Sequence, residues 1–323
     1  MTVLVTGAAG FIGRHVLEAL AGAGRPARGF DLAPLPGAAE HVVGNLLDPA
    51  AVARALAGVD AVIHIAGIGT LWQRDADAYE RVNVDGTRRL AEAAKAAGVA
   101  RFVHLSSAVT LVGAGSHRGA VVTEADRPPE VALFGPYCRS KRRAEEVLAG
   151  VGLGEPVVVL PTAPVGPGHR AQDARGTEPM AMLCDLLSGR TPAFLDCRLD
   201  LIDVRDLAQA ILAALAAPPG RYLAAGHGVE FRALLALLAE LSGRPMPRHR
   251  VPQRLALAAA VAQEAIARRT GKPPQASVAG VRIAGKSVRF DAGRSLGCLG
   301  VVPRPLAASL GDAIQWLQTV GVP

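Results

Sequence analysis

The segment VLVTGAAGFIGRHV, residues 3–16, decides the fold. A short apolar strand leads directly into glycines at positions 7, 10 and 13, and a helical pattern follows. Gly7 permits a tight turn, Gly10 lets a phosphate group approach the backbone, and Gly13 lets helix and strand pack closely. The helix N-terminus adds free N–H groups and a positive dipole end. The segment therefore predicts a dinucleotide-binding βαβ turn, with ordinary turn glycines as the alternative.

Strands of four to six residues alternate with helices through the first 165 residues, a pattern typical of βαβ units. We predict an α/β fold, a doubly wound parallel sheet (Rossmann fold) with a smaller, mostly helical C-terminal substrate cap. The predicted NAD-binding domain comprises 1–165 plus 200–225, and the predicted cap comprises 166–199 and 226–323. Helices are expected at 11–23, 49–57, 77–97, 137–148, 180–188, 231–241, 253–269 and 305–320.

Asp31 ends the second predicted strand, 18 residues after Gly13. A carboxylate there can accept hydrogen bonds from the adenosine ribose and would repel a 2′-phosphate. No arginine follows it directly. We therefore expect NAD as the cofactor in preference to NADP, with a helix-capping aspartate as the alternative.

Tyr137 and Lys141 stand four residues apart in FGPYCRSKRRAEE, residues 134–146, and so share one helix face. A nearby ammonium stabilises phenolate, so we expect Lys141 to lower the pKa of Tyr137. The predicted strand RFVHLSS ends in Ser106 and Ser107, on the same sheet edge as the glycine loop. A tyrosine, a lysine and a serine at a cofactor site indicate acid–base chemistry at an oxygen of the substrate.

Further segments extend the pattern along nearly the whole chain: HIAG (64–67), RVNVDGT (81–87), RFVHLSSA (101–108), PTAPVGPG (161–168) and LIDVRDLAQA (201–210). With the glycine loop, Asp31 and YCRSK, they resemble the extended short-chain dehydrogenase/reductases, the NAD-dependent epimerase/dehydratase group. The SSA run is similar to the dihydroflavonol-reductase-like and 3β-hydroxysteroid-dehydrogenase-like members. The C-terminal half resembles the hopanoid-associated branch.

The resemblance implies three catalytic residues. Tyr137 would be the acid/base, Lys141 would tune it and bond the nicotinamide ribose, and Ser107 would orient the substrate, with Ser106 as the fallback. It also implies contacts to the cofactor from Gly7, Ala9, Gly10, Phe11, Ile12, Asp31, Asn45, Leu46, Ile65, Ala66, Gly67, Asn83, Leu105, Ser106, Tyr137, Lys141, Pro161 and Thr162. Asn83 is further expected to stabilise the helix near the active site, and His64 and His104 are expected to be strand residues.

The expected reaction is the NAD-dependent interconversion of a secondary alcohol and a ketone on a fairly apolar small molecule, such as a steroid, terpenoid or flavonoid. No acidic residue follows the serines, which disfavours dehydratases and decarboxylases of this group. A nucleotide-sugar epimerase with tightly held NAD is the first alternative. Its diphosphate needs cations, for which the candidates are Arg205, Arg232, Arg282 and Arg289. A non-catalytic NAD-binding regulator is the second alternative.

Charge is uneven along the 323 residues: 221–323 carry 14 Lys and Arg against 5 Asp and Glu, whereas 1–220 carry 21 against 23. The basic part could attract an anionic substrate or a membrane, or could simply be solvated. Scarce aromatic residues argue against nucleic-acid binding. The four cysteines and eight histidines show no metal-ligand spacing, so no metal is expected. We expect a cytoplasmic protein, since no signal sequence or membrane span is recognisable.

Two further expectations concern helices. The helices at 77–97 and 137–148 are expected to form a homodimer contact, with Ala91, Ala94 and Ala97 allowing close packing. The apolar helix at 253–269 is expected to line the substrate pocket in preference to touching a membrane, because its charges do not form a continuous basic face.

Overall fold

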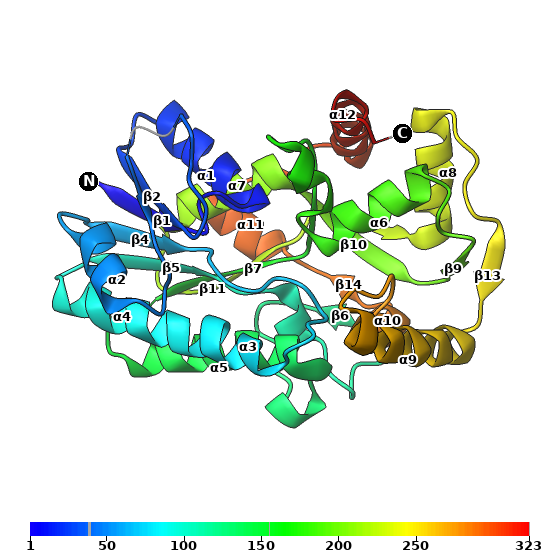
Figure 1. The fold of residues 1–323 in the computed structure, drawn as a ribbon, viewed down its shortest axis with the longest axis horizontal. Helices are drawn as coiled ribbons and strands as arrows, with labels where there is room; N and C mark the ends of the chain where they lie inside the picture. Colours follow the sequence, from blue (N-terminus) through cyan, green and yellow to red (C-terminus); the bar gives the residue numbers. More distant parts are fainter. Residues whose placement is uncertain (38–39, 155, 323) are drawn as a thin grey trace.

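The computed structural model describes residues 1–37, 40–154 and 156–322, and is built around a seven-stranded parallel sheet (Figure 1). The strands follow the order β3-β2-β1-β4-β5-β7-β11 across the sheet. This order places the first strand centrally and confirms the predicted doubly wound Rossmann sheet. The strands are β1 (Val3–Thr6), β2 (Ala27–Asp31), β3 (His41–Val43), β4 (Ala61–His64), β5 (Arg101–Leu105), β7 (Val157–Pro161) and β11 (Gly220–Ala224).

Helices cover both faces of the sheet because its strands are buried on both sides (Figure 1). One face packs against α1 (Phe11–Gly22) and α7 (Val204–Ala214) in a single apolar cluster. The opposite face packs against α2 (Pro49–Leu56), α4 (Gly86–Ala96) and α5 (Gly135–Gly150). The alternating strand side chains thus serve two separate cores.

The helix predicted at 77–97 is present but is not uniform. It begins with α3 (Asp77–Tyr79), continues as a π-helical segment over Glu80–Asp85, and ends as α4. Such π-helical turns are rare and often lie at functional sites. Asn83 lies within this turn, which therefore sets the direction of its side chain.

The alanines proposed for a dimer contact do not all face outward. Ala91 and Ala94 are fully buried and pack in the core between α4 and the sheet. Of the three, only Ala97, the C-cap residue that follows α4, is exposed. The expectation that these alanines allow close subunit packing is therefore wrong for Ala91 and Ala94, because their small size lets α4 approach its own sheet.

The cap has its own apolar cluster, around α6 (Glu178–Leu187), α8 (Phe231–Ser242) and α12 (Leu306–Thr319). Short strands supplement it: β8 (Ala163–Val165), β10 (Arg198–Asp203) and β12 (His227–Glu230) form one sheet, β9 (Ala193–Leu195) pairs with β13 (His249–Val251), and β6 (Val121–Val122) pairs with β14 (Arg289–Phe290). Helices α9 (Gln253–Thr270) and α10 (Val278–Lys286) pack together at its outer edge (Figure 1).

One helix within the predicted cap range belongs structurally to the sheet. α11 (Gly293–Leu299) packs against β11, and Leu299 joins the core beneath α1 and α7. The chain therefore returns from the cap to close the β11 edge before it ends in α12.

We expect Ile63→Ala to lower the free energy of unfolding by about 2–5 kcal/mol, because Ile63 is fully buried in the central strand β4 and the substitution leaves a cavity. Urea denaturation measures this change. Val131→Ala is the control, since that side chain is 85% exposed and its loss should be nearly neutral. Equal stabilities of the two variants would contradict the assignment of β4 to the core.

Candidate active site

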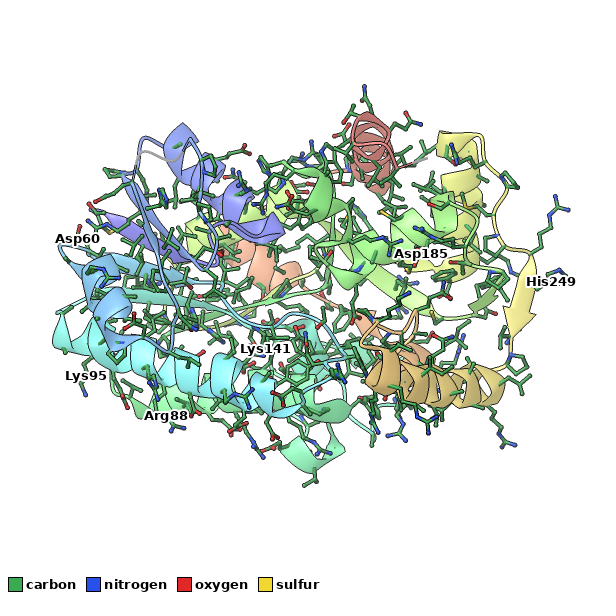
Figure 2. The ribbon with its side chains drawn as sticks, viewed as in Figure 1. Asp60, Arg88, Lys95, Lys141, Asp185 and His249 are labelled. Atoms are coloured by element: carbon green, nitrogen blue, oxygen red, sulfur yellow. The ribbon has the colours of Figure 1, made fainter. Side chains whose placement is uncertain are left out.

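The predicted site residues meet at the carboxyl edge of the parallel sheet, where ligands bind in such folds. The ends of the neighbouring strands β7, β5, β4, β1 and β2 supply them in spatial order. Lys141 of α5 points into the middle of the molecule at this edge, between the Rossmann sheet and the cap (Figure 2).

The glycine loop has the geometry that a dinucleotide requires. Gly7 has a φ of +70°, and a Cβ there would lie 2.7 Å from the backbone nitrogen of Ala66. A Cβ on Gly13 would overlap the Gly7 carbonyl oxygen, so α1 can approach β1 only because both residues are glycine. No side chain caps the start of α1 within the described residues. Its first-turn N–H groups are thus available to a phosphate.

Two arginines beside this loop were not predicted from the sequence. The side chains of Arg14 and Arg170 both donate to the carbonyl oxygen of Ala9, the former at 3.4 Å. Burial lowers the pKa of Arg14, and the charge of Arg170 lowers it further. Two adjacent guanidinium groups raise the positive potential where a pyrophosphate would bind. Arg14 directly follows Gly13, but the approach of Arg170 depends on the cap.

Asp31 faces the glycine loop, as expected. Its carboxylate accepts hydrogen bonds from the backbone N–H groups of Ala9, at 2.9 Å, and Ala33, at 3.0 Å. A bend follows it, not a helix, so it does not act as a helix cap. The carboxylate is partly exposed and retains capacity for a ribose hydroxyl.

The remaining residues expected at the cofactor lie on the same edge. Asn45 and Leu46 follow β3, and the Asn45 side-chain oxygen accepts from the Leu47 N–H at 3.0 Å. Strand-end positions also hold Ile65, Ala66, Leu105, Pro161 and Thr162. The Thr162 hydroxyl donates to Asp200 at 2.7 Å, and burial raises the pKa of that carboxyl. The structure therefore brings these residues to one rim, and their contacts with a cofactor stay predictions.

Asn83 fastens the π-helical turn to the active site. Its side-chain oxygen accepts from the Ile68 N–H at 2.7 Å, and its amide donates to the Ile68 carbonyl and to the Ser140 hydroxyl. A Cβ on Gly67 would lie 2.8 Å from the Asn83 oxygen and 3.6 Å from Lys141 Nζ. Asn83 thus links the end of β4 to α5. Its hydrogen bonds support the expected positioning role more than direct contact with a cofactor.

Tyr137 is buried, and its environment reverses the predicted pKa shift. Burial raises the pKa of the phenol above its ordinary value, while the nearby Ser107 side chain lowers it only in part. The Lys141 charge is not among the main groups that act on Tyr137. The pKa of Tyr137 is therefore shifted in the direction opposite to the one expected, because loss of solvation outweighs the Ser107 hydrogen bond and the charge of Glu178 adds to the rise.

Lys141 is itself buried, and this burial lowers the pKa of its ammonium to about 8. The nearby Glu145 carboxylate opposes part of the shift. Lys141 Nζ donates to the Leu105 carbonyl oxygen at 3.0 Å, which holds it against the end of β5. A lysine that is held in this way, with a pKa of about 8, is suited to a functional role.

The two serines after β5 have different environments. Ser107 is partly exposed and lies near Tyr137, whereas Ser106 is buried and donates to Glu145 at 2.5 Å. Glu145 also accepts from Thr110 at 3.2 Å and lies 3.3 Å from Arg221. This buried network was not predicted, since Arg221 is distant in sequence. It supports Ser107 as the substrate-orienting serine and leaves Ser106 a structural role.

The surroundings of Tyr137 are largely apolar. Ile68, Leu71, Val109 and Ile283 are partly buried and pack against the cluster that contains Tyr137. They come from three separate parts of the chain, the loop after β4, the segment after β5 and α10 of the cap. Apolar side chains that line a site favour an apolar ligand.

A buried carboxyl, Glu178, also lies near Tyr137. Glu178 Oε1 accepts from the Leu71 N–H at 2.5 Å, and burial raises the pKa of this carboxyl. Its charge in turn helps to raise the pKa of Tyr137. Sequence reasoning missed Glu178 because only the folded cap brings the start of α6 beside the loop after β4.

The strand histidines behave as expected. The His64 ring bonds the hydroxyls of Thr6 and Thr87, and burial lowers its pKa to about 3. His104 is also fully buried, and burial lowers its pKa well below the ordinary value. Both rings are therefore neutral parts of the sheet core.

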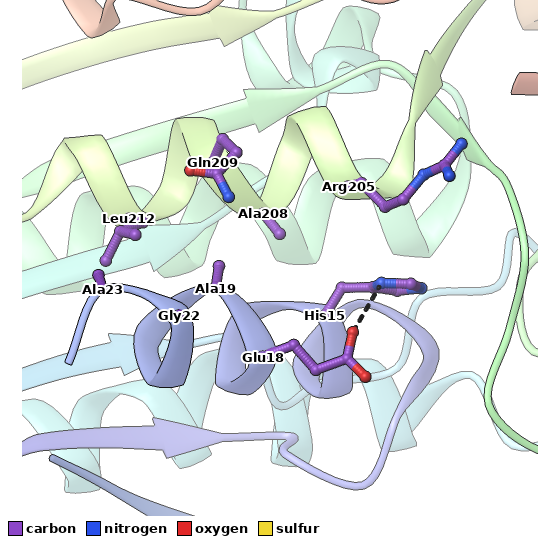
Figure 3. Close-up of a pocket in the computed structure, with 9 residues that line it drawn as sticks. All are labelled: His15, Glu18, Ala19, Gly22, Ala23, Arg205, Ala208, Gln209 and Leu212. Atoms are coloured by element: carbon purple, nitrogen blue, oxygen red, sulfur yellow. Dashed lines mark ion pairs between the residues drawn. The ribbon is translucent and has the colours of Figure 1, made fainter. Parts of the chain in front are cut away.

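Away from the rim, an open groove of about 450 Å³ lies between α1 and α7 (Figure 3). His15 Nδ1 lies 3.6 Å from Glu18, and His169 bonds the same carboxylate at 2.6 Å. The three side chains could converge on a cation, although the His169–Glu18 bond by itself ties the loop after β8 to α1. Tyr137 and Lys141 do not line this groove, so we assign it no part in the reaction.

Comparison with known proteins identifies the family. The sequence model of the NAD dependent epimerase/dehydratase family matches residues 3–225. Sterol demethylase protein B of Methylococcus capsulatus is 33% identical over 100% of both chains. The 4-hydroxy-2-methyl-3-oxo-4-farnesyl-3,4-dihydroquinoline-1-oxide ketoreductase of Stigmatella aurantiaca is 30% identical over 94% of this chain and 93% of its own. The structure of MoeE5 in complex with UDP-glucose and NAD superposes with a TM-score of 0.75 at 25% identity, covering 99% of each chain.

The chain belongs to the NAD dependent epimerase/dehydratase family, and the resemblance drawn from its motifs is confirmed. It is an NAD-dependent enzyme of the short-chain dehydrogenase/reductase and epimerase type. The glycine loop, the uncapped start of α1 and Asp31 are the features of this chain that fit the cofactor.

We expect Asp31→Asn to weaken NAD binding about tenfold, because the ribose loses a charged hydrogen-bond acceptor. The variant should also discriminate less against NADP, since the charge that repels the 2′-phosphate is gone. Isothermal titration with both nucleotides measures this. Asp60→Asn is the matched control, as Asp60 precedes β4 at the opposite edge of the sheet. Tighter binding of NADP than NAD by the unaltered protein would contradict the role given to Asp31.

Proposed function

We propose that this protein interconverts a secondary alcohol and a ketone on a fairly apolar small molecule, such as a steroid, terpenoid or flavonoid. The observation that carries the proposal is the apolar wall, by which we mean Ile68, Leu71, Val109 and Ile283, packed against the cluster that contains Tyr137. The names of the relatives from Methylococcus and Stigmatella support it, since they denote a sterol-modifying protein and a ketoreductase acting on a farnesylated compound.

The protonation state of Tyr137 favours reduction. Because burial raises the pKa of the phenol, Tyr137 holds its proton at neutral pH and can donate it to a carbonyl oxygen. When bound, NAD in its reduced form supplies the hydride that the carbonyl carbon gains. Ser107 orients the substrate oxygen and stabilises the phenolate that remains. The apolar wall excludes water from the reacting atoms.

Lys141 and Asn83 position these groups. Lys141 is held by the Leu105 carbonyl next to Gly67, where it can also bond a nicotinamide ribose. Asn83 fixes the backbone of Ile68, one of the apolar wall residues. The cap closes the site through α10, which carries Ile283.

The first alternative, a nucleotide-sugar epimerase, draws support from the likeness to MoeE5 in complex with UDP-glucose. A diphosphate would need arginines with spare charge. Arg205, one of the four candidates, is paired with both Asp203 and Asp312 at 2.7 Å. Arg232, Arg282 and Arg289 are exposed. The two functions differ in cofactor use, because an epimerase keeps its dinucleotide through turnover, whereas a dehydrogenase releases it.

We expect Tyr137→Phe to lower kcat about 10²- to 10⁴-fold while NAD binding is retained, because the phenyl ring preserves packing but has no proton to transfer. The assay follows NADH absorbance with a panel of steroid, terpenoid and flavonoid ketones and alcohols. Native mass spectrometry of the gently purified protein accompanies it. Turnover with retained nucleotide, on a nucleotide sugar only, would replace the proposal by the epimerase alternative. Full retention of function by the variant would instead indicate a non-catalytic regulator.

We expect Ser107→Ala to lower kcat by at least about tenfold with little loss of stability, since its hydroxyl is partly exposed and lies near Tyr137. Ser106→Ala is the matched comparison. It should mainly lower the free energy of unfolding, because Glu145 loses a buried donor. Steady-state kinetics and thermal unfolding of both variants separate the two roles. The opposite result would make Ser106 the substrate-orienting serine.

A further inference from the structure

Helix α9 has an unusual distribution of side chains. Two polar side chains in its second half face the protein: Gln263 accepts from the Ala276 N–H at 3.2 Å, and Glu264 accepts from the Val278 N–H at 2.7 Å. Only two of its residues, Ala260 and Ala267, are fully buried. A surface helix normally turns its apolar side chains to the core and its polar ones to water.

The outward side of α9 exposes large apolar side chains along its length. Leu255 is 62% exposed, Val261 54% and Ile266 60%. The helical spacing aligns Leu255 with Ile266 through two exposed alanines, Ala259 and Ala262. Such a contiguous exposed apolar surface marks an interaction site. The expectation that α9 lines the substrate pocket does not account for this face, which points away from the protein.

Positive charge surrounds this apolar face. Residues 244–272 contain seven Lys and Arg but one Asp or Glu. That single acid, Glu264, is turned inward. On and beside the helix, Arg248, Arg254, Arg268, Arg269 and Lys272 are exposed. Within the described residues, no ion pair involves Arg254 or Arg269, so their charge is available to a partner.

We propose that the exposed face of α9, with its rim of basic residues, docks onto the surface of an anionic phospholipid bilayer. Leu255, Val261 and Ile266 would enter the boundary between headgroups and acyl chains, and the arginines would contact the phosphates. Each basic residue near an anionic surface adds to the attraction. The contact is peripheral, since the described residues include no helix long and apolar enough to cross a membrane.

Charge also argues against a second copy of the chain as the occupant of this face. A symmetric contact through α9 would bring Arg254, Arg268 and Arg269 of one copy toward the same residues of the other. Like charges placed together oppose association. An anionic lipid surface instead complements both the apolar face and its rim.

Docking at α9 would place the bilayer one helix away from the active site. α9 packs on α10, and Ile283 of α10 packs against the cluster that contains Tyr137. An apolar substrate could therefore pass from the bilayer to Tyr137 along the cap. This last step rests on the proposed function, whereas lipid binding by α9 does not.

The test is flotation of the purified full-length protein with vesicles, at low and high salt. We expect binding to vesicles of phosphatidylcholine mixed with phosphatidylglycerol, little binding to phosphatidylcholine alone, and release by salt. The double variant Leu255→Ser/Ile266→Ser should bind about tenfold more weakly or worse. Val302→Ser is the matched control, because Val302 is 87% exposed but lies outside α9, and it should bind like the unaltered protein.

Several outcomes would overturn the proposal: no binding by the unaltered protein, equal binding to both lipid mixtures, or undiminished binding by the double variant. Light scattering provides a further test. If the unaltered protein is a dimer and the double variant is a monomer, a second copy of the chain covers the face, and the proposal is overturned. Thermal unfolding confirms that the variants are folded. Turnover of a water-soluble test ketone should be unchanged in the double variant, so that failure of lipid binding and failure of the proposed function are distinguishable.

Discussion

The close approach of α1 to the sheet is the constraint on which the rest of the structure depends. Gly7 and Gly13 allow backbone atoms to come within distances that any Cβ would prevent. This contact directs the uncapped start of α1 toward the carboxyl edge of the sheet. Asp31, Arg14 and the ends of the neighbouring strands are positioned around that point, and so the cofactor site and the catalytic site occupy one rim.

Burial, more than charge, sets the chemistry at this rim. It raises the pKa of Tyr137, which keeps its proton, and lowers that of Lys141 to about 8, so that the ammonium loses its proton more readily than usual. The charged groups Glu145 and Arg221 lie behind these residues, in a buried network with Ser106. An apolar environment beside a proton-bearing phenol is suited to an apolar ketone, whereas a nucleotide sugar would need more exposed cationic groups near the reacting atoms.

The cap extends from the surroundings of Tyr137 to the surface of the molecule. Its helix α10 supplies Ile283 to the wall of the site, and α9 covers α10 with polar contacts while turning an apolar face outward. The same two helices can therefore serve substrate binding and lipid contact. The proposed lipid contact would account for the basic C-terminal part of the sequence without an anionic substrate.

The sequence by itself determined the Rossmann sheet, the family and the NAD cofactor, because the glycine spacing and the strand–helix alternation are local patterns that few folds accommodate. It also indicated Tyr137, Lys141 and Ser107 through their motifs. Only the tertiary structure decided the direction of the Tyr137 pKa, which depends on burial by segments distant in sequence. It likewise decided that Ala91 and Ala94 face the core and that α9 turns its apolar face outward, because helical periodicity defines a face but not what covers it.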